Sequence, residues 1–338
     1  MNYILILFLP IGIYLINFIF KRKSFLLNYT GEKHQKFTIK EKIPLSGGCV
    51  LLSSYFLIFN NFDPILSVCL IMIFCLGLFS DLKIIISPKI RFLFQLLIIF
   101  AFAFFLKLEI NNTRVIFLDA MIKNNFFSYF FVIFCVLILV NGTNFIDGLN
   151  TNVLGYYLIV SVFLYFQNLH TLLEIDKFQW INWIYCLAII YVFNFFNNLF
   201  IGDNGAYLIS LFYSFLVIKI FSINPNISPF YIVLLLWYPC FEILFSIIRK
   251  IKFNRSPLHP DNKHFHQILF ILIKKNMKIK NIDFNSLSAQ IINFYNLAII
   301  FLGSLDIYNS QYQILLILVN IFLYIFIYLR ILNKINKN

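Results

Sequence analysis

The chain has 338 residues, of which 61% are hydrophobic and only 12% are charged, and its formal net charge is +13. About a quarter of the residues in a water-soluble domain are charged, so this composition excludes a soluble globular fold. Long apolar runs, without the short alternating segments of a β-barrel, indicate an all-α, polytopic integral membrane protein. In such a protein the positive-inside rule explains the basic excess better than nucleic-acid binding does.

The apolar runs predict about ten or eleven transmembrane helices in one catalytic domain, residues 1–338. The first run, at about 3–20, lacks a basic start and is followed by Lys21-Arg22-Lys23, which favours a retained helix over a cleaved secretion signal. The other runs lie at about 46–60, 64–79, 90–108, 127–143, 152–168, 181–199, 206–222, 229–248, 289–304 and 312–330.

The connectors alternate between the two sides of the membrane. One set holds 22 of the 27 Lys and Arg residues. The positive-inside rule therefore predicts that this set is cytoplasmic, with the N-terminus outside and the C-terminus cytoplasmic. The cytoplasmic loops are then about 21–45, 80–91, 144–151, 200–205 and 249–288.

A basic stretch precedes the second apolar run. It contains Lys33, His34 and Lys42, and it is followed by a proline and by Gly47-Gly48. Glycines let backbone amides approach a ligand closely, so this loop suits an anionic group. An ordinary positive-inside loop with a helix breaker is the alternative interpretation.

Acidic residues follow the cytoplasmic ends of three predicted helices. Asp81 follows the third helix, and Asp203 lies between two glycines after the seventh. Between them, Asn141, Asn144 and Asp147 recur every three residues, so on a continuing helix they form one stripe. Helix capping or a polar turn would explain any one of these acids. Three acids at the same membrane face favour a functional site.

The largest cytoplasmic connector contains three of the five histidines, His259, His264 and His266. The spacing of His264 and His266 is unlike the i, i+4 pair of a helical zinc site, and no cysteine accompanies them. A loop that faces phosphate is the better interpretation. Carboxylates that bind Mg²⁺, together with basic residues around phosphates, are typical of phosphoryl transfer. The membrane setting implies that one substrate is a lipid phosphate.

These segments, in this order, resemble the polyprenyl-phosphate N-acetylhexosamine-1-phosphate transferase family, glycosyltransferase family 4. The last segment is more similar to the undecaprenyl-phosphate GlcNAc-1-phosphate transferase branch than to the phospho-MurNAc-pentapeptide translocase. The resemblance covers about Lys33 to Gln267 and is carried by Lys33-His34, Ile43-Pro44-Leu45-Ser46-Gly47-Gly48, Ser80-Asp81, Asn141, Asn144, Asp147-Gly148, Phe200-Ile201-Gly202-Asp203-Asn204-Gly205 and Pro260-Asp261-Asn262-Lys263-His264-Phe265-His266.

The resemblance implies a reaction at the cytoplasmic face of the inner membrane. N-acetylhexosamine-1-phosphate would pass from a UDP-sugar to undecaprenyl phosphate, giving polyprenyl-diphospho-sugar and UMP, at the start of cell-wall or lipopolysaccharide polysaccharide synthesis. The implied cofactor is Mg²⁺, with Mn²⁺ as an alternative, and a homodimer is an open alternative to a monomer. The implied catalytic residues are Asp81, Asp147, Asp203 and His264, with the three aspartates as metal ligands. The implied substrate-binding residues are Lys33, His34, Lys42, Asn141, Asn144, Phe200, Asp261 and His266.

Three positions depart from the family pattern. Ser80 replaces the first of two adjacent aspartates, Asn150 replaces a second acid, and Gln267 replaces a third histidine. If the first aspartate were an obligatory nucleophile, this chain would be an inactive family member. Direct attack by the lipid phosphate is the preferred reading, because a phosphate monoester with its second pKa near ~6 is largely dianionic at neutral pH. A transporter or flippase for an anionic lipid or solute is the alternative from another class.

Overall fold

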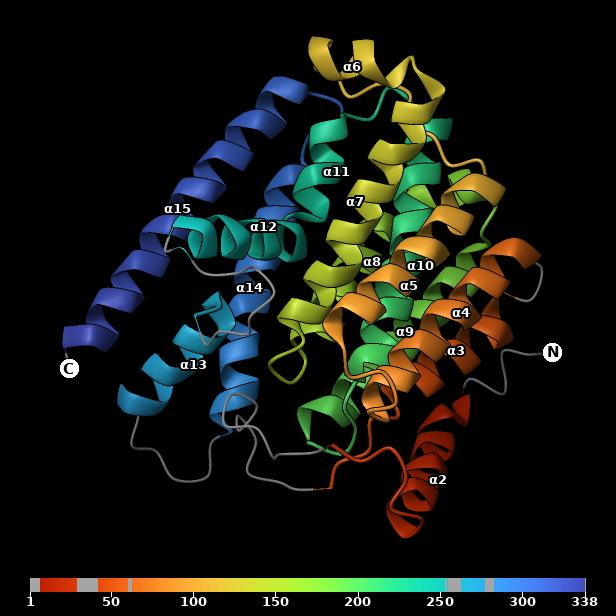
Figure 1. The fold of residues 1–338 in the computed structure, drawn as a ribbon, viewed down its shortest axis with the longest axis vertical. Coiled ribbons are helices and arrows are strands. Elements are labelled where there is room, and N and C mark those ends of the chain that lie inside the picture. The colour runs from red at the N-terminus through yellow and green to blue at the C-terminus, as the bar shows by residue number, and fades with distance from the viewer. Residues whose placement is uncertain are drawn as a thin grey trace.

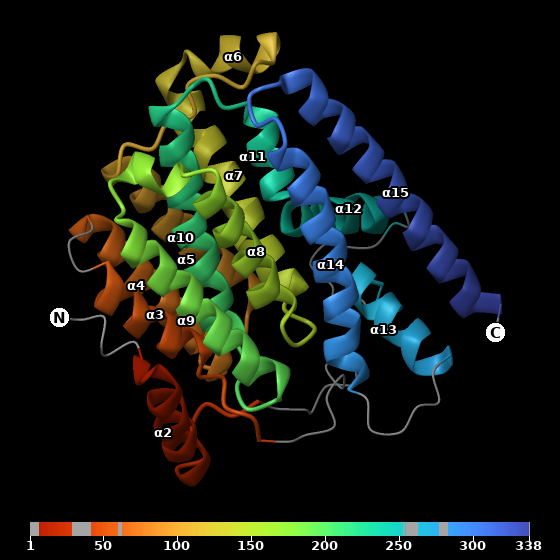
Figure 2. The same cartoon turned by 180° about the vertical axis from the view of Figure 1, so that it is seen from behind.

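The computed structural model describes residues 7–28, 42–59, 63–252, 254, 263–276 and 283–337. These residues form the predicted all-helical bundle, and no β-strand occurs among them (Figures 1 and 2). The α-helices are α2 (Leu9–Arg22), α3 (Gly47–Ile58), α4 (Pro64–Asp81), α5 (Pro88–Phe105), α6 (Ile116–Ile122), α7 (Asn125–Ile146), α8 (Asn152–Phe166), α9 (Lys177–Phe195), α10 (Gly202–Ile223), α11 (Pro229–Leu235), α12 (Trp237–Lys252), α13 (Phe265–Asn276), α14 (Phe284–Ser304) and α15 (Ser310–Lys337), with a 3₁₀ turn, η2 (Leu169–Leu173).

Seven of the described helices are long and apolar enough to cross a membrane, namely α4, α5, α7, α9, α10, α14 and α15. An eighth span results if the bent pair α11 and α12 counts as one. The prediction of a polytopic membrane bundle is confirmed, but ten or eleven spans exceed this number. The expected spans at 46–60 and 152–168 are the shorter apolar helices α3 and α8. The first expected span overlaps α2, which lies beyond the lower end of the bundle in Figure 1.

Helix α10 is the central helix of the bundle. Most of its side chains are buried, and it packs against α3, α4 and α7. Glycines allow the first turn of α10 to approach α3 and α4 closely. A methyl group added at Gly48 or at Gly77 would collide with the backbone of Asn204, and Gly48 itself faces Gly205. The polar start of α10 is therefore held directly against α3 and α4.

A proline explains the break between α11 and α12, which meet at an angle of 79°. Pro239 has no N–H, so it cannot donate the helical hydrogen bond to the carbonyl of Leu235. The hydroxyl of Tyr156 on α8 donates to that carbonyl instead, at 2.8 Å. A buried carbonyl without a partner would be costly, so this tyrosine stabilises the break. The predicted span at 229–248 thus corresponds to a bent pair of helices, in which α12 runs across the bundle (Figure 1).

Helix α13 lies within the connector that was expected to be the cytoplasmic loop 249–288. Helix α13 follows the histidine-rich stretch and packs against α14 and α15. Its buried face contains Ile268, Leu269 and Phe270, whereas Lys274 and Lys275 are exposed. This amphipathic pattern explains why α13 forms against the other two helices.

Gly77→Ala is expected to separate α4 from the start of α10. The new methyl group would lie 2.6 Å from the backbone nitrogen of Asn204, and backbone atoms cannot yield as a flexible side chain can. Overpacking of this kind costs about 1–3 kcal/mol. The melting temperature of purified protein in detergent should fall. Gly12→Ala on α2 is the control, because nothing lies within 4 Å of its new methyl group. Equal melting temperatures for the two variants would contradict this packing.

Candidate functional site

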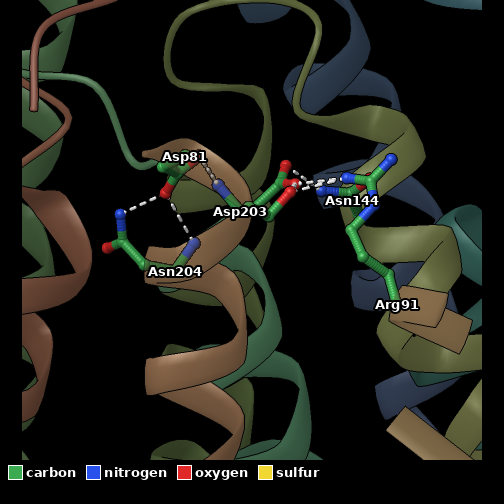
Figure 3. A network of polar contacts seen from close by, with 6 residues as sticks. Asp81, Arg91, Asn144, Asp203 and Asn204 are labelled. Carbon is green, nitrogen blue, oxygen red and sulfur yellow. Dashed lines mark hydrogen bonds and ion pairs between the residues drawn. The ribbon is translucent and has the colours of Figure 1, made fainter. Parts of the chain in front are cut away.

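Asp81 binds the first turn of α10. Its two carboxylate oxygens accept hydrogen bonds from the backbone N–H groups of Asp203 and Asn204, each at 3.0 Å, and Oδ2 also accepts from the Asn204 side-chain amide. The first N–H groups of a helix have no intrahelical partner and carry partial positive charge, so a carboxylate is stabilised there. Asp81 therefore holds the start of α10, and with it the side chain of Asp203, in place (Figure 3).

Asp203 is the centre of a polar network from four helices. Its Oδ1 accepts a hydrogen bond from the Asn144 amide on α7 at 2.6 Å. Its Oδ2 accepts from the Ser80 hydroxyl on α4 at 2.6 Å and from the Arg91 guanidinium on α5 at 2.9 Å. The same Arg91 nitrogen donates to Ser80 Oγ at 2.6 Å. Figure 3 shows Asn144 and Arg91 on one side of Asp203 and Asp81 on the other.

Asp147 lies just beyond the end of α7, and no described side chain donates a hydrogen bond to its carboxylate. Burial raises the pKa of this carboxyl group well above its ordinary value, and the negative charges of Asp203 and Asp81 raise it further. Within the part of the chain that the structure describes, Asp147 is thus an acid without a hydrogen-bond donor or an ion-pair partner, beside two other acids. A cation, or a donor on a substrate, would stabilise its ionised form.

The loop before α3 supports the same turn from another side. The N–H of Phe200 donates to the carbonyl of Pro44 at 2.8 Å, and the N–H of Gly47 donates to the carbonyl of Phe200 at 2.9 Å. Gly202 has a φ of +67°, and a methyl group there would lie 2.8 Å from an oxygen of Asp81. Only glycine fits this position without strain. The predicted first and fourth motifs therefore meet in space.

The two histidines of the last motif lie against the α7 turn. The His264 ring packs edge-on against Phe145 with centroids 5.0 Å apart, and it stacks on the His266 ring at 5.7 Å. His266 fills the space over Gly148, where a methyl group would collide with its ring. Burial lowers the pKa of the His266 imidazole to about 3, with a further contribution from His264, so His266 is neutral at physiological pH.

A cluster of amide side chains fixes the turn between α7 and α8. The N–H of Asn150 donates to Asn285 at 2.6 Å, and the N–H of Thr151 donates to the side-chain oxygen of Asn194. Thr151 adopts a left-handed backbone with a φ of +67°, and its carbonyl accepts from Asn293 at 2.9 Å. The side-chain amide of Asn150, which replaces an acid of the family pattern, donates to the side-chain oxygen of Asn197, so this residue has a structural role in the chain.

The remaining predicted residues have different surroundings. Asn141 donates to the carbonyl of Leu137 one turn earlier, at 2.9 Å, so in this arrangement its amide is satisfied within α7. Lys42 is exposed, with a left-handed φ of +61°. Lys33, His34 and Asp261 lie outside the described residues. Their assignment as substrate-binding residues stays a prediction.

Arg91 and Glu242 contact predicted site residues, although neither was predicted to belong to the site. Arg91 belongs to the second polar segment of the sequence, but its partner is 112 positions away. Glu242 is the other, a buried acid in an apolar run that contacts His264. A lone carboxylate inside a hydrophobic segment is a signal of function that could have identified it.

The donors at this site suit a hard cation. Carboxylate oxygens are the ligands that Mg²⁺ prefers, and the ion is usually bound by one or two carboxylates together with phosphate oxygens and water. Within the described ranges, no three His, Cys, Asp or Glu side chains converge closely enough to form a complete metal site. Asp203 and Asp147 can supply the protein's carboxylate ligands. Asp81 is less suited, because both of its oxygens accept hydrogen bonds from the α10 backbone. Their use as metal ligands stays a proposal.

The central part of the chain, which contains this network, is similar to a known protein family. Residues 64–221 match the model of glycosyl transferase family 4. The resemblance inferred from the motifs is thereby confirmed over this part of the chain. The matched segment runs from the first residues of α4 almost to the end of α10, so it includes Ser80, Asp81, Arg91, Asn144, Asp147 and Asp203.

The chain is also similar to one relative whose activity is named. The chain is 30% identical over 71 residues to an undecaprenyl-phosphate alpha-N-acetylglucosaminyl 1-phosphate transferase of Thermotoga maritima. The aligned segment covers 21% of this chain and 23% of the relative. The chain thus matches less than a quarter of the length of that relative.

Asp203→Asn is expected to abolish turnover in a folded protein. The amide keeps the size of the side chain but cannot supply the negative charge that Arg91 and a cation would bind. Loss of one electrostatic group in an active site typically costs about 10²–10³-fold in kcat. Turnover by purified protein in detergent measures the effect. Glu109→Gln, at an exposed acid outside the network, is the control. Wild-type turnover by Asp203→Asn would contradict the assignment.

Asp147→Asn is expected to stabilise the metal-free protein while reducing turnover. The folded-state pKa of Asp147 is raised, so its ionisation as the pH rises costs folding stability. At pH 7 in EDTA the variant should melt at a higher temperature than the wild type. The difference should shrink as the pH falls toward about 4, where an unfolded aspartate becomes protonated. A lower melting temperature at pH 7 would contradict the uncompensated charge.

Proposed function

We propose that this protein transfers N-acetylhexosamine-1-phosphate from a UDP-sugar to polyprenyl phosphate, releasing UMP. The observation that carries the proposal is the network around Asp203, built from the ends of α4 and α7 and the starts of α5 and α10. These ends lie at one end of the bundle, where a lipid phosphate and a soluble nucleotide can meet. A transporter would more often keep its binding groups near the middle of the membrane, on broken helices.

The chemistry needs no strong base from the protein. A phosphate oxygen of the dianionic lipid would attack the β-phosphorus of the UDP-sugar, and the bond from that phosphorus to the bridging oxygen would break. The bridging oxygen leaves with UMP, and the new phosphorus–oxygen bond gives polyprenyl-diphospho-sugar. The Ser80 hydroxyl, which donates to Asp203, would act as a hydrogen-bond donor and not as a nucleophile. Its presence is therefore compatible with an active enzyme.

Charged side chains would stabilise the diphosphate during transfer. Arg91 would turn part of its guanidinium from Asp203 to a phosphate oxygen, because guanidinium groups bind phosphate strongly. His264 and His266 would face the same substrate from the other side of the α7 turn. Asp203 and Asp147 would hold Mg²⁺, or alternatively Mn²⁺, which when bound supplies charge neutralisation to the diphosphate. Half-buried Phe200 would contact the base of the nucleotide.

The lipid chain would occupy apolar space beside α12. A cavity of about 390 Å³ lies between α7, α10, α11, α12 and α15, and its lining is almost wholly apolar, with Leu139, Val217, Trp237 and Leu244 among its residues. Lys250, at the far end of α12, lies 5.8 Å from the centre of the Phe145 ring, beside the histidine pair. A chain along α12 would therefore bring its phosphate toward His264.

We further propose that the donor is UDP-GlcNAc, with epimers and 6-deoxy amino sugars as alternatives. The relative in Thermotoga maritima carries N-acetylglucosamine in its name, which supports this choice. The basic connectors support a cytoplasmic site in the inner membrane. The product would then start a cell-envelope polysaccharide.

Purified protein incubated with undecaprenyl phosphate, Mg²⁺ and a panel of UDP-N-acetyl sugars is expected to release UMP with one sugar above all. The release should be lost on adding EDTA and restored by excess Mg²⁺. A control without undecaprenyl phosphate separates transfer from hydrolysis. No release from folded protein with any sugar would contradict the proposal and favour an inactive or repurposed site.

A further inference from the structure

Glu242 is a buried carboxylate outside the aspartate network. It lies in the middle of α12, and only 1% of its surface is exposed. A buried carboxylate is costly unless hydrogen bonds or an opposite charge compensate it, so its partners indicate what it does. It is also the sole acidic residue of α12, whose last turn is basic.

Three donors converge on this carboxylate from two other parts of the chain. Its Oε1 accepts from His264 Nδ1 at 3.1 Å and from the backbone N–H of Phe265 at 3.1 Å. Its Oε2 accepts from the hydroxyl of Tyr324 on α15. A second tyrosine of α15, Tyr328, donates to the carbonyl of Lys263 at 2.9 Å. The segment before α13 is thus bound to α15 through Lys263 and to α12 through His264.

These bonds determine the state of the His264 ring. An ionised carboxylate can only accept hydrogen bonds, so Nδ1 of His264 must carry a proton. Nε2 is then the nitrogen with the lone pair when the ring is neutral. A carboxylate behind a histidine fixes both its tautomer and its orientation.

The ring held in this way belongs to the site. His264 packs against Phe145, which lies between Asn144 and Asp147, and its ring is nearly parallel to that of His266, with an angle of 12° between the planes. The imidazole therefore lies against the turn at the end of α7. This turn carries Asn144, which donates to Asp203, and Asp147. A rotated ring would lose the contact with Phe145 or with His266.

We propose that Glu242 is a positioning residue, which holds His264 as the Nδ1-protonated tautomer and aims its other nitrogen at the phosphate-bearing substrates. The proposal rests on the proposed function in that His264 would contact those substrates. Glu242 does not touch them itself and acts through the histidine. Tyr324 keeps the carboxylate in place from α15, so the C-terminal helix contributes to the geometry of the site.

The test compares Glu242→Gln with Tyr324→Phe. The glutamine keeps the volume of the side chain but no longer forces the proton onto Nδ1. The phenylalanine removes one hydrogen bond from the same carboxylate and leaves its contact with His264. Glu242→Gln should lower kcat about 10- to 100-fold with little change in KM, as removal of a partner behind a histidine does. Tyr324→Phe should lower kcat by much less. Melting temperatures establish that both variants are folded.

The direct readout is the ¹⁵N spectrum of protein labelled at histidine. The chain has five histidines, and His264→Gln assigns the signal of His264. The wild type should show His264 protonated at Nδ1, and Glu242→Gln should shift that signal toward a mixture of tautomers. Wild-type kcat and an unchanged His264 signal in Glu242→Gln would overturn the proposal. Equal losses of kcat in both variants would also overturn it, because they would indicate packing alone.

The same spectra distinguish a failure of the proposed transferase function from a failure of the positioning role of Glu242. A wild type that releases no UMP would contradict the proposed function, yet its spectrum would still report the tautomer of His264. An active wild type whose His264 signal does not depend on Glu242 would contradict the positioning role and leave the proposed function intact.

Discussion

The bond between the Asp81 carboxylate and the first turn of α10 is the constraint on which the site depends. Most of helix α10 is buried, and its first N–H groups have no partner within the helix. Asp81 satisfies two of them at 3.0 Å each. Glycines in α3 and α4 bring these helices close enough for that contact. The position of Asp203 follows, because it is one of the two residues whose N–H groups are bound.

Charge balance is the second constraint. Three acids in a confined site repel one another, and the chain compensates them unequally. Asp203 has Arg91, Ser80 and Asn144 as donors, whereas Asp147 has none among the described side chains. Such an arrangement resembles a site prepared for additional positive charge. A cation and a diphosphate would enter together, since each lowers the cost of the other.

Much of this arrangement could be predicted from the sequence, because hydropathy and motif order are local signals. The all-helical membrane bundle and the meeting of the acidic helix ends were both expected. The expected spans at 46–60 and 152–168 are the shorter apolar helices α3 and α8, because hydropathy alone does not locate the ends of a helix. The break at Pro239 had a local signal, but the Tyr156 hydroxyl that donates to the Leu235 carbonyl lies 79 positions from it. The pairing of Glu242 with Tyr324, separated by 82 positions, depends on α12 crossing the bundle and had no local signal.

The destination of the donor's β-phosphorus tests the central claim, that this polar network transfers a sugar phosphate and not a sugar alone. Protein incubated with undecaprenyl phosphate, Mg²⁺ and UDP-GlcNAc labelled with ³²P at the β position would be extracted with butanol. The label should pass into the lipid fraction together with the sugar, in equal amounts. Label that stays with the nucleotide as UDP, while the sugar reaches the lipid, would contradict the central claim.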